Sequence, residues 1–255
     1  MWSLIGYCRN SKLRQRFKKL RHPPKILLAT LTNYAIRPTT CEVVDFATSQ
    51  VYYWNMASPP RLFENGSFYH VYNRGNRKQQ IFLGYKDYER FLNKTLEYKK
   101  KFNVNIVAFC LMSNHFHFLI QQLSPNTISK FFSDLCNSYS RYFNTKYETV
   151  GGLYQGRFKA KRIDKDEYLI HVSRYIHLNP VGLFGPSENL VSNLLAYRWS
   201  SLQYYLSSGR NEIIDANVIL NYFSKINPVE DYKKFVISNI EVPAYPDIEH
   251  LVFEE

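Results

Sequence analysis

Two histidines separated by one residue are the first candidates for chemistry in this chain. His115 and His117 belong to the segment HFHFLIQ, whose aromatic and β-branched residues predict a β-strand. Because side chains alternate across a strand, both imidazoles project from one face while Phe116 projects from the other. Two imidazole nitrogens on one face suit a divalent metal ion. The same pair also fits two half-buried polar residues at a sheet surface, so a metal site requires a further element.

A tyrosine and an asparagine one turn apart on a later helix supply that element. Residues 167–180 carry apolar side chains at helical spacing, which predicts a helix with one buried stripe. Tyr175 and Asn179 share one edge of this helix, whereas His177 faces away. A phenol beside an amide oxygen that coordinates a hard cation suits an enzyme with tyrosine as nucleophile on a metal-bound phosphate. In a chain with 21 tyrosines, a core or surface role for Tyr175 is the competing interpretation.

The elements that must position these residues follow in the order β-α-β-β-α-β. We expect a strand at 68–72, a helix capped by Asp87, strands at 104–110 and 115–121 joined by a turn, a helix opened by Pro125 and Asn126, a short basic strand at 153–163, and a helix started by the capping box Asp164–Glu167 and ended by Pro180. This order predicts an α+β protein with a ferredoxin-like split βαβ fold and an antiparallel sheet. The helices should cover one face of the sheet and leave the other face open for a ligand.

The net charge of +12 is unevenly distributed along the 255 residues. Residues 1–55 hold nine basic and two acidic residues, residues 56–206 hold twenty and ten, and residues 207–255 hold four and nine. We therefore predict a basic N-terminal extension at 1–55, a central domain at 56–206 and an acidic C-terminal tail at 207–255. The extension is interpreted as disordered or not native, because it lacks a regular pattern and Met56 would serve as an alternative first residue.

Composition indicates the class of partner. A basic central domain favours a polyanion, and the 21 Tyr and 18 Phe provide surfaces on which unpaired bases stack. A solvated basic face with its aromatic residues in the core is the alternative. Four widely spaced cysteines form neither a disulfide framework nor a cysteine zinc site, which fits a reducing cytoplasm. No apolar run reaches the roughly 18 residues of a membrane span, so we expect no membrane partner.

Five separated segments together carry a family resemblance. The segments are Gly66–Asn76, Phe109–Ile120, Ser138–Tyr147, Gly152–Phe158 and Glu167–Gly182, the last followed by Tyr197–Ser201. They resemble the IS200-like transposase family, including its REP-associated tyrosine transposase branch. The resemblance runs in order over about residues 64–206 and excludes both the extension and the tail.

This resemblance implies an HUH endonuclease fold and a specific reaction. The reaction is metal-dependent cleavage and joining of single-stranded DNA through a 5′-phosphotyrosine intermediate. His115 and His117 match the metal-ligating histidines of the family, and Tyr175 matches its catalytic tyrosine. Asn179 matches the position of a third ligand to Mg²⁺ or Mn²⁺.

Basic and polar residues near these positions in sequence are candidates for contacts to DNA phosphates. They are Arg74, Asn76, Arg157, Lys159, Lys161 and Arg162. The expected partner is single-stranded DNA that contains a hairpin, and the protein is either a monomer or a homodimer. Two other functions stay open: a catalytically silent, repressor-like protein that binds hairpin DNA or RNA, and a metal-site hydrolase with water as the nucleophile.

Overall fold

The computed structural model describes residues 40–45, 50–55, 62–185, 188–207, 211–238 and 240. The chain divides into two compact units, Met1–Arg61 and Leu62–Glu255. In the first unit, β1 (Thr40–Asp45) pairs antiparallel with β2 (Gln50–Asn55). The basic run at 12–21 lies outside the described residues. All candidate site residues belong to the second unit.

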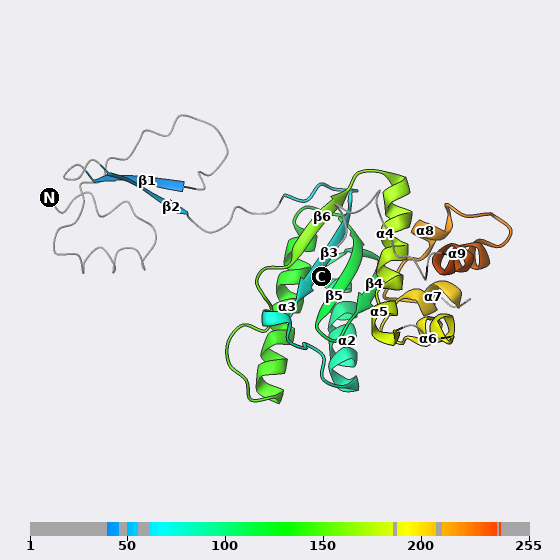
Figure 1. Cartoon of the computed structure of the whole chain (residues 1–255). Helices are drawn as coiled ribbons and strands as arrows, with labels where there is room; N and C mark the ends of the chain where they lie inside the picture. Colours follow the sequence, from blue (N-terminus) through cyan, green and yellow to red (C-terminus); the bar gives the residue numbers. More distant parts are fainter. Residues whose placement is uncertain are drawn as a thin grey trace. The chain divides into compact units, whose positions relative to one another are not determined.

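A four-stranded sheet forms the centre of the second unit (Figure 1). Its strands lie in the order β4 (Asn105–Leu111), β5 (His115–Gln121), β3 (Phe68–Arg74) and β6 (Lys159–Ile163). All neighbouring strands are antiparallel. The order of strands and helices along the chain is β-α-β-β-α-β, so the prediction of an antiparallel α+β fold is confirmed.

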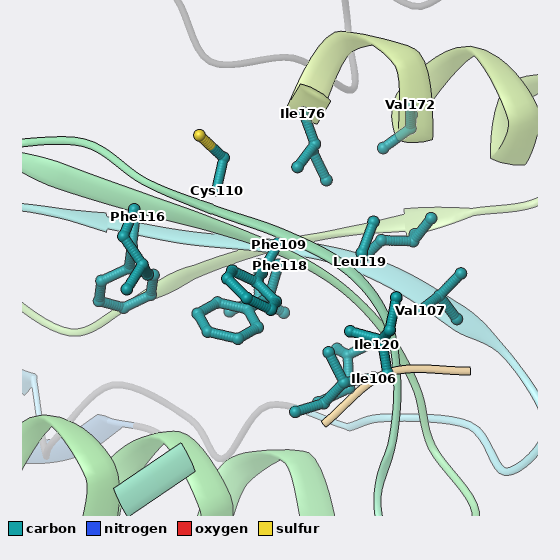
Figure 2. Packing of buried hydrophobic residues seen from close by; sticks show 14 of the residues in the cluster. Ile106, Val107, Phe109, Cys110, Phe116, Phe118, Leu119, Ile120, Val172 and Ile176 are labelled. Carbon is teal, nitrogen blue, oxygen red and sulfur yellow. The ribbon is translucent and has the colours of Figure 1, made fainter. Parts of the chain in front are cut away.

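Two long amphipathic helices cover one face of the sheet. They are α2 (Tyr85–Phe102) and α3 (Thr127–Lys146). Phe116 and Phe118 of β5 point to this face in Figure 2. Phe116 stacks on Phe132 of α3, and Phe118 meets the same ring edge to face. Alternation along β5 therefore places His115 and His117 on the opposite face of the sheet.

Helix α4 (Asp166–Leu178) lies against the opposite face of the sheet. Val172 and Ile176 of α4 point toward the strands in Figure 2, and both are fully buried. The expectation that this whole face is open is wrong, since α4 packs on β4 and β5. The physical reason is that the apolar stripe of α4 must be buried, and Leu119 and Cys110 on this face are also fully buried.

Short helices complete the second unit beyond α4 (Figure 1). They are α5 (Val181–Phe184), α6 (Leu190–Ala196), α7 (Leu202–Leu206), α8 (Asn217–Leu220) and α9 (Pro228–Ile237), and a 3-10 turn, η2 (Asn76–Lys78), follows β3. Helices α8 and α9 both contact α4. Tyr232 and Val236 of α9 are buried in the same core. Part of the segment 207–255 expected as an acidic tail therefore packs into the domain, because its apolar residues have a partner in α4.

The helix starts differ in detail from the sequence-based expectation. Asp87 does cap α2, but from inside the first turn, where its carboxylate accepts hydrogen bonds from the amides of Leu83 and Gly84. The expected capping box at Asp164–Glu167 is wrong. Helix α4 begins at Asp166, and its N-cap residue Lys165 makes no side-chain capping bond. The basic strand β6 is also shorter than predicted and starts at Lys159.

A search of the described residues for membrane-spanning segments gives a negative result: none of their helices combines the length and the apolar character that crossing a bilayer requires.

Candidate active site

The pairing of β3 with β5 gathers three histidines on one face of the sheet. In this antiparallel register, Tyr72 lies opposite His117 and Arg74 lies opposite His115. His70 is on the same face as these residues because it lies two residues before Tyr72. Its Nε2 lies 2.9 Å from Nδ1 of His117, and the two nitrogens share a hydrogen bond. His70, His115 and His117 are all buried.

Hydrogen bonds fix which nitrogen of each candidate ligand is available to a metal. Nδ1 of His115 lies 2.6 Å from Oδ1 of Asn114, so the ring donates there. Nδ1 of His117 is bonded to His70. In both rings a metal would therefore take Nε2, and both Nε2 atoms are buried. Partners on the second nitrogen that fix ring orientation are the usual arrangement around metal-bound histidines.

Burial also sets the charge state of His117. Burial in the apolar interior, together with the neighbouring rings of His115 and His70, holds the pKa of His117 well below its ordinary value. The imidazole is therefore neutral at physiological pH, and neutral imidazole is the form that binds a metal.

Helix α4 brings Tyr175 to these histidines. The centre of the Tyr175 ring lies 5.6 Å from that of His117 and 5.7 Å from that of His70, both edge to face. The half-buried Tyr175 keeps part of its surface accessible, whereas the flanking Arg174 and Ile176 are buried. Packing of α4 on the sheet therefore positions a partly accessible phenol next to the histidine pair, in a single chain.

Asn179 is the C-cap residue of α4 and lies one helical turn after Tyr175. Its Nδ2 donates a 2.9 Å hydrogen bond to the backbone carbonyl of Tyr175, one turn earlier. This bond holds the amide group at the end of the helix and leaves Oδ1 as its acceptor atom. The described contacts thus link Asn179 to Tyr175 and Tyr175 to two histidines.

These residues fit an open metal site with few protein ligands. Two neutral imidazoles and an amide oxygen would leave other coordination positions for water or substrate, as in catalytic metal centres. Among the described residues, no group of three or more His, Cys, Asp or Glu is arranged as a metal site. A metal here would therefore depend on the His115–His117 pair with an oxygen ligand of a different kind.

Comparison with known proteins identifies the domain that carries this site. A family model described as "Transposase IS200 like" matches residues 65–179. The match covers less than half of the chain, and over these residues the chain is similar to the IS200-like transposases. The match begins just before β3 and ends at Asn179, so the IS200-like segment includes both histidines and Tyr175.

Two solved structures resemble the chain more distantly. A REP-associated tyrosine transposase bound to a REP hairpin is 17% identical, with a TM-score of 0.45, and the similarity covers 63% of this chain and 94% of that one. A Deinococcus radiodurans R1 protein assigned as a transposase is 14% identical, with a TM-score of 0.34, covering 47% and 95%. A search of curated proteins finds no match to the chain.

The candidate DNA-binding residues of the IS200-like domain fall into two groups. On β6, Lys159 lies opposite Tyr72 of β3 and Lys161 lies opposite His70. Both lysines are therefore on the sheet face that holds the histidines. Arg162 lies opposite Tyr69 and therefore on the other face, where it forms an ion pair with Glu64. The two lysines therefore share a sheet face with His70, whose ring contacts Tyr175, and Arg162 does not.

The remaining candidates are Arg74, the last residue of β3, Asn76, just after β3, and Arg157, just before β6. Arg74 donates hydrogen bonds of 3.1 and 3.3 Å to the side chain of Gln155, so the end of β3 is joined to the segment before β6 at the His115 end of the sheet. Asn76 and Arg157 are exposed, one in the turn that follows β3 and one in the segment before β6.

His177 is correctly predicted to face away from the histidine pair. Its Nδ1 lies 2.6 Å from the hydroxyl of Tyr232, and its Nε2 lies 2.7 Å from Oγ of Ser201. Burial lowers the pKa of His177 to about 3, so the ring is neutral. His177 therefore links the side of α4 that faces away from the histidine pair to α9 and to the segment before α7.

Sequence reasoning missed His70 as a site residue, although its segment was among those that resemble the family. Nothing within β3 alone distinguishes it from any other polar residue of a strand. The available signal was period-two alternation: His70, Tyr72 and Arg74 share one face, and that face would be adjacent to His115 and His117 if β3 paired with β5.

Proposed function

We propose that the IS200-like domain cleaves and rejoins single-stranded DNA through a covalent bond to Tyr175. The observation that carries this proposal is the 5.6 Å separation between the rings of Tyr175 and His117, on the sheet face that also holds His115. The similarity of residues 65–179 to the IS200-like transposases supports transposase chemistry at this position.

In the proposed reaction, Oη of Tyr175 attacks the phosphorus of one phosphodiester in the strand. A bond forms between the tyrosine oxygen and phosphorus, and the bond from phosphorus to the 3′ oxygen breaks. The phenol proton leaves to water, and the departing 3′ oxygen takes up a proton. The products are a 5′-phosphotyrosine and a free 3′-OH. Joining reverses these steps with another 3′-OH, and the phosphoester count stays constant, so no nucleotide cofactor is needed.

A divalent metal is the proposed cofactor, with His115, His117 and Asn179 as its ligands. When bound, Mg²⁺ or Mn²⁺ would act as a Lewis acid on the phosphodiester. The neutral imidazoles favour a first-row transition metal over Mg²⁺, which prefers oxygen ligands. Of these two ions we therefore expect Mn²⁺ to bind more tightly. His70 would hold His117 in the orientation that directs Nε2 at the metal.

The proposed partner is single-stranded DNA that contains a hairpin, as in the REP-associated branch. Its support is the family of the domain and the charge of the surface near Tyr175. Lys159 and Lys161 are on the histidine face, and Arg157 is exposed just before them. Phosphate contacts from such residues position a strand without reading its sequence.

The test is covalent capture of labelled DNA on a denaturing gel. Wild-type protein with Mn²⁺ and a single-stranded hairpin oligonucleotide should yield a protein–DNA band, and EDTA should abolish it. Tyr175→Phe deletes one oxygen atom and should give no adduct and no cleavage while DNA binding persists. Tyr168→Phe is the matched control on the same helix, because its hydroxyl accepts a 3.2 Å hydrogen bond from the exposed Lys165, and this variant should behave as wild type.

Three outcomes separate the possible functions. An adduct on a different tyrosine would refute the role of Tyr175 within the same reaction. Cleavage without an adduct in either protein would favour a hydrolase that uses water. Binding without any cleavage by the wild-type protein, with Mn²⁺ and with Mg²⁺, would favour a silent DNA- or RNA-binding protein.

A further inference from the structure

A set of stacked aromatic rings runs from the core to the surface at the start of α2. Phe82 stacks on Tyr88 at 4.4 Å between ring centres, and Tyr88 stacks on Trp199 at 4.4 Å with an angle of 12° between the planes. Tyr85 packs edge-on against Trp199 at 5.0 Å. Tyr85 and Tyr88 share one side of α2 because they are three residues apart.

The outer end of this set is exposed and positively charged. Tyr85 is 49% exposed, which is unusual for so large an aromatic residue with ordered partners. The guanidinium of the exposed Arg198 lies 5.2 Å from the centre of the Tyr85 ring. Lys86 is the next residue along α2 and is also exposed. An accessible aromatic ring bordered by cations is the composition that binds a base and its phosphate.

Hydrogen bonds attach the segment that carries Trp199 to the sheet. The carbonyl of Trp199 accepts a 2.8 Å bond from the amide of Leu111, and the hydroxyl of Tyr197 donates a 2.7 Å bond to the Leu111 carbonyl. The segment with Trp199 is therefore attached along the outer edge of β4, next in the sheet to β5 and its two histidines. Rings that are already fixed lose little conformational entropy when a ligand binds.

We propose that Tyr85, Trp199 and Arg198 form a subsite for one unpaired base of a bound single strand. The base stacks on the exposed Tyr85 ring, and Arg198 contacts the adjoining phosphate. This inference rests on the proposed function, because it supplies an additional contact to the same strand. Trp199 and Arg198 lie beyond residues 65–179, so the subsite is built partly by chain outside the matched family segment.

Binding measurements with matched variants test the subsite. Fluorescence anisotropy with labelled oligothymidylate gives the affinity of Tyr85→Ala, Tyr85→Phe and Tyr98→Ala. Tyr98 is the control because it lies on the same helix and also has cations over its ring, from Lys94 and Lys101. We expect Tyr85→Ala to weaken binding about 5- to 150-fold, the range for loss of one stacked base, and Tyr85→Phe and Tyr98→Ala to bind as wild type. The salt dependence of Tyr85→Ala should be unchanged, since no phosphate contact is removed.

An abasic strand identifies the group that is recognised. When every base is absent, wild type and Tyr85→Ala should bind equally, because nothing is left to stack. The proposal is overturned if Tyr85→Ala binds oligothymidylate as tightly as wild type, or if it loses the same factor on the abasic strand. It is also overturned if the substitution changes only the molar mass of the protein in solution, which would identify the patch as an interface between copies.

The binding assay tests the subsite and the covalent assay tests the proposed reaction, so either proposal can be refuted without the other. At saturating DNA, Tyr85→Ala should still form the Tyr175 adduct, since the subsite is separate from the nucleophile. Loss of the adduct in wild type would refute the proposed reaction and leave the binding result interpretable. Tyr85→Ala should also unfold at the wild-type temperature, because the side chain that it removes is half exposed.

Discussion

Asp87 offers the sharpest test of how the two covering helices are held together. Its carboxylate is fully buried at the start of α2 and accepts five hydrogen bonds. Two come from the backbone amides of Leu83 and Gly84, at 2.9 and 3.0 Å. Three come from the end of α3 and the residue after it, and the donors are Tyr142 at 3.0 Å, Lys146 at 2.6 Å and Tyr147 at 2.7 Å. One carboxylate therefore joins the first turn of α2 to the last turn of α3.

The expected cost of Asp87→Asn follows from these partners. The amide keeps the shape of the side chain but removes the charge and places a donor among donors. Breaking a buried ion pair costs about 3–5 kcal/mol, and Lys146, whose side chain is 34% exposed, regains some hydration. We therefore expect a loss of about 3 kcal/mol in the free energy of unfolding. For a unit of this size the melting temperature should fall by roughly 6–12 °C.

The same carboxylate should make stability depend on pH. Burial favours the protonated form, but the hydrogen bonds from Lys146, Tyr147, the Leu83 amide and Tyr142 outweigh it, so the pKa of Asp87 lies below its ordinary value. Its contribution is therefore complete above pH of about 4, where the unfolded carboxyl is ionised, and is lost as the pH falls through the lower pKa of the folded state.

Urea unfolding at neutral and acidic pH measures both effects. Wild type should exceed Asp87→Asn by about 3 kcal/mol at pH 7, and the difference should shrink as the pH falls below 4. Asp134→Asn is the control, because the Asp134–Lys101 pair on α3 and α2 is largely exposed and should contribute under about 1 kcal/mol. The reasoning is refuted if the two substitutions cost the same, or if the Asp87 difference does not change with pH.

Other predictions concern the site. Removing residues 1–55 should leave the fold and the cleavage of DNA intact, with some loss of affinity at low salt, as circular dichroism and the gel assay would show. His115→Ala and His117→Ala should each abolish cleavage and Mn²⁺ binding measured by calorimetry, and activity that survives in both, or in EDTA, would refute the metal site. His70→Ala should weaken Mn²⁺ binding about 10- to 100-fold, as for other partners of metal-bound histidines, and unchanged binding would refute its orienting role.

Local patterns were sufficient to predict the elements of the site. The period of two along 115–121 places His115 and His117 on one face, and the stripe of α4 sets Tyr175 apart from His177. Both predictions are correct because each depends on the geometry of one strand or one helix. The β-α-β-β-α-β order follows in the same way, because the spacing of apolar residues changes along the chain between the period of two of a strand and the period of 3.6 of a helix.

The features that sequence reasoning missed depend on pairs that are distant along the chain. His70 becomes a site residue only because β3 pairs with β5. This pairing allows its hydrogen bond to His117, which is 47 residues later in the chain. The position of α4 over β4 and β5 is likewise set by packing between distant segments. In the segment after residue 206, the net negative charge led to the prediction of an acidic tail, although Ile219 and Tyr232 of this segment are buried. Net charge reports on the exposed side chains of a helix and carries no information about the face that the helix buries.

The geometry of the site depends on chain that lies outside the matched family segment. Helix α4 presents Tyr175 to His70 and His117 on one side and His177 to Ser201 and Tyr232 on the other. Rotation of α4 about its axis would break the buried hydrogen bonds of His177 to Tyr232 and Ser201, which costs about 1–3 kcal/mol for each group left unpaired. An attacking oxygen must be held within a fraction of an ångström for efficient chemistry. Tyr232, which belongs to α9 in the acidic segment after residue 206, therefore contributes to the placement of the proposed nucleophile, Tyr175, through its hydrogen bond to His177.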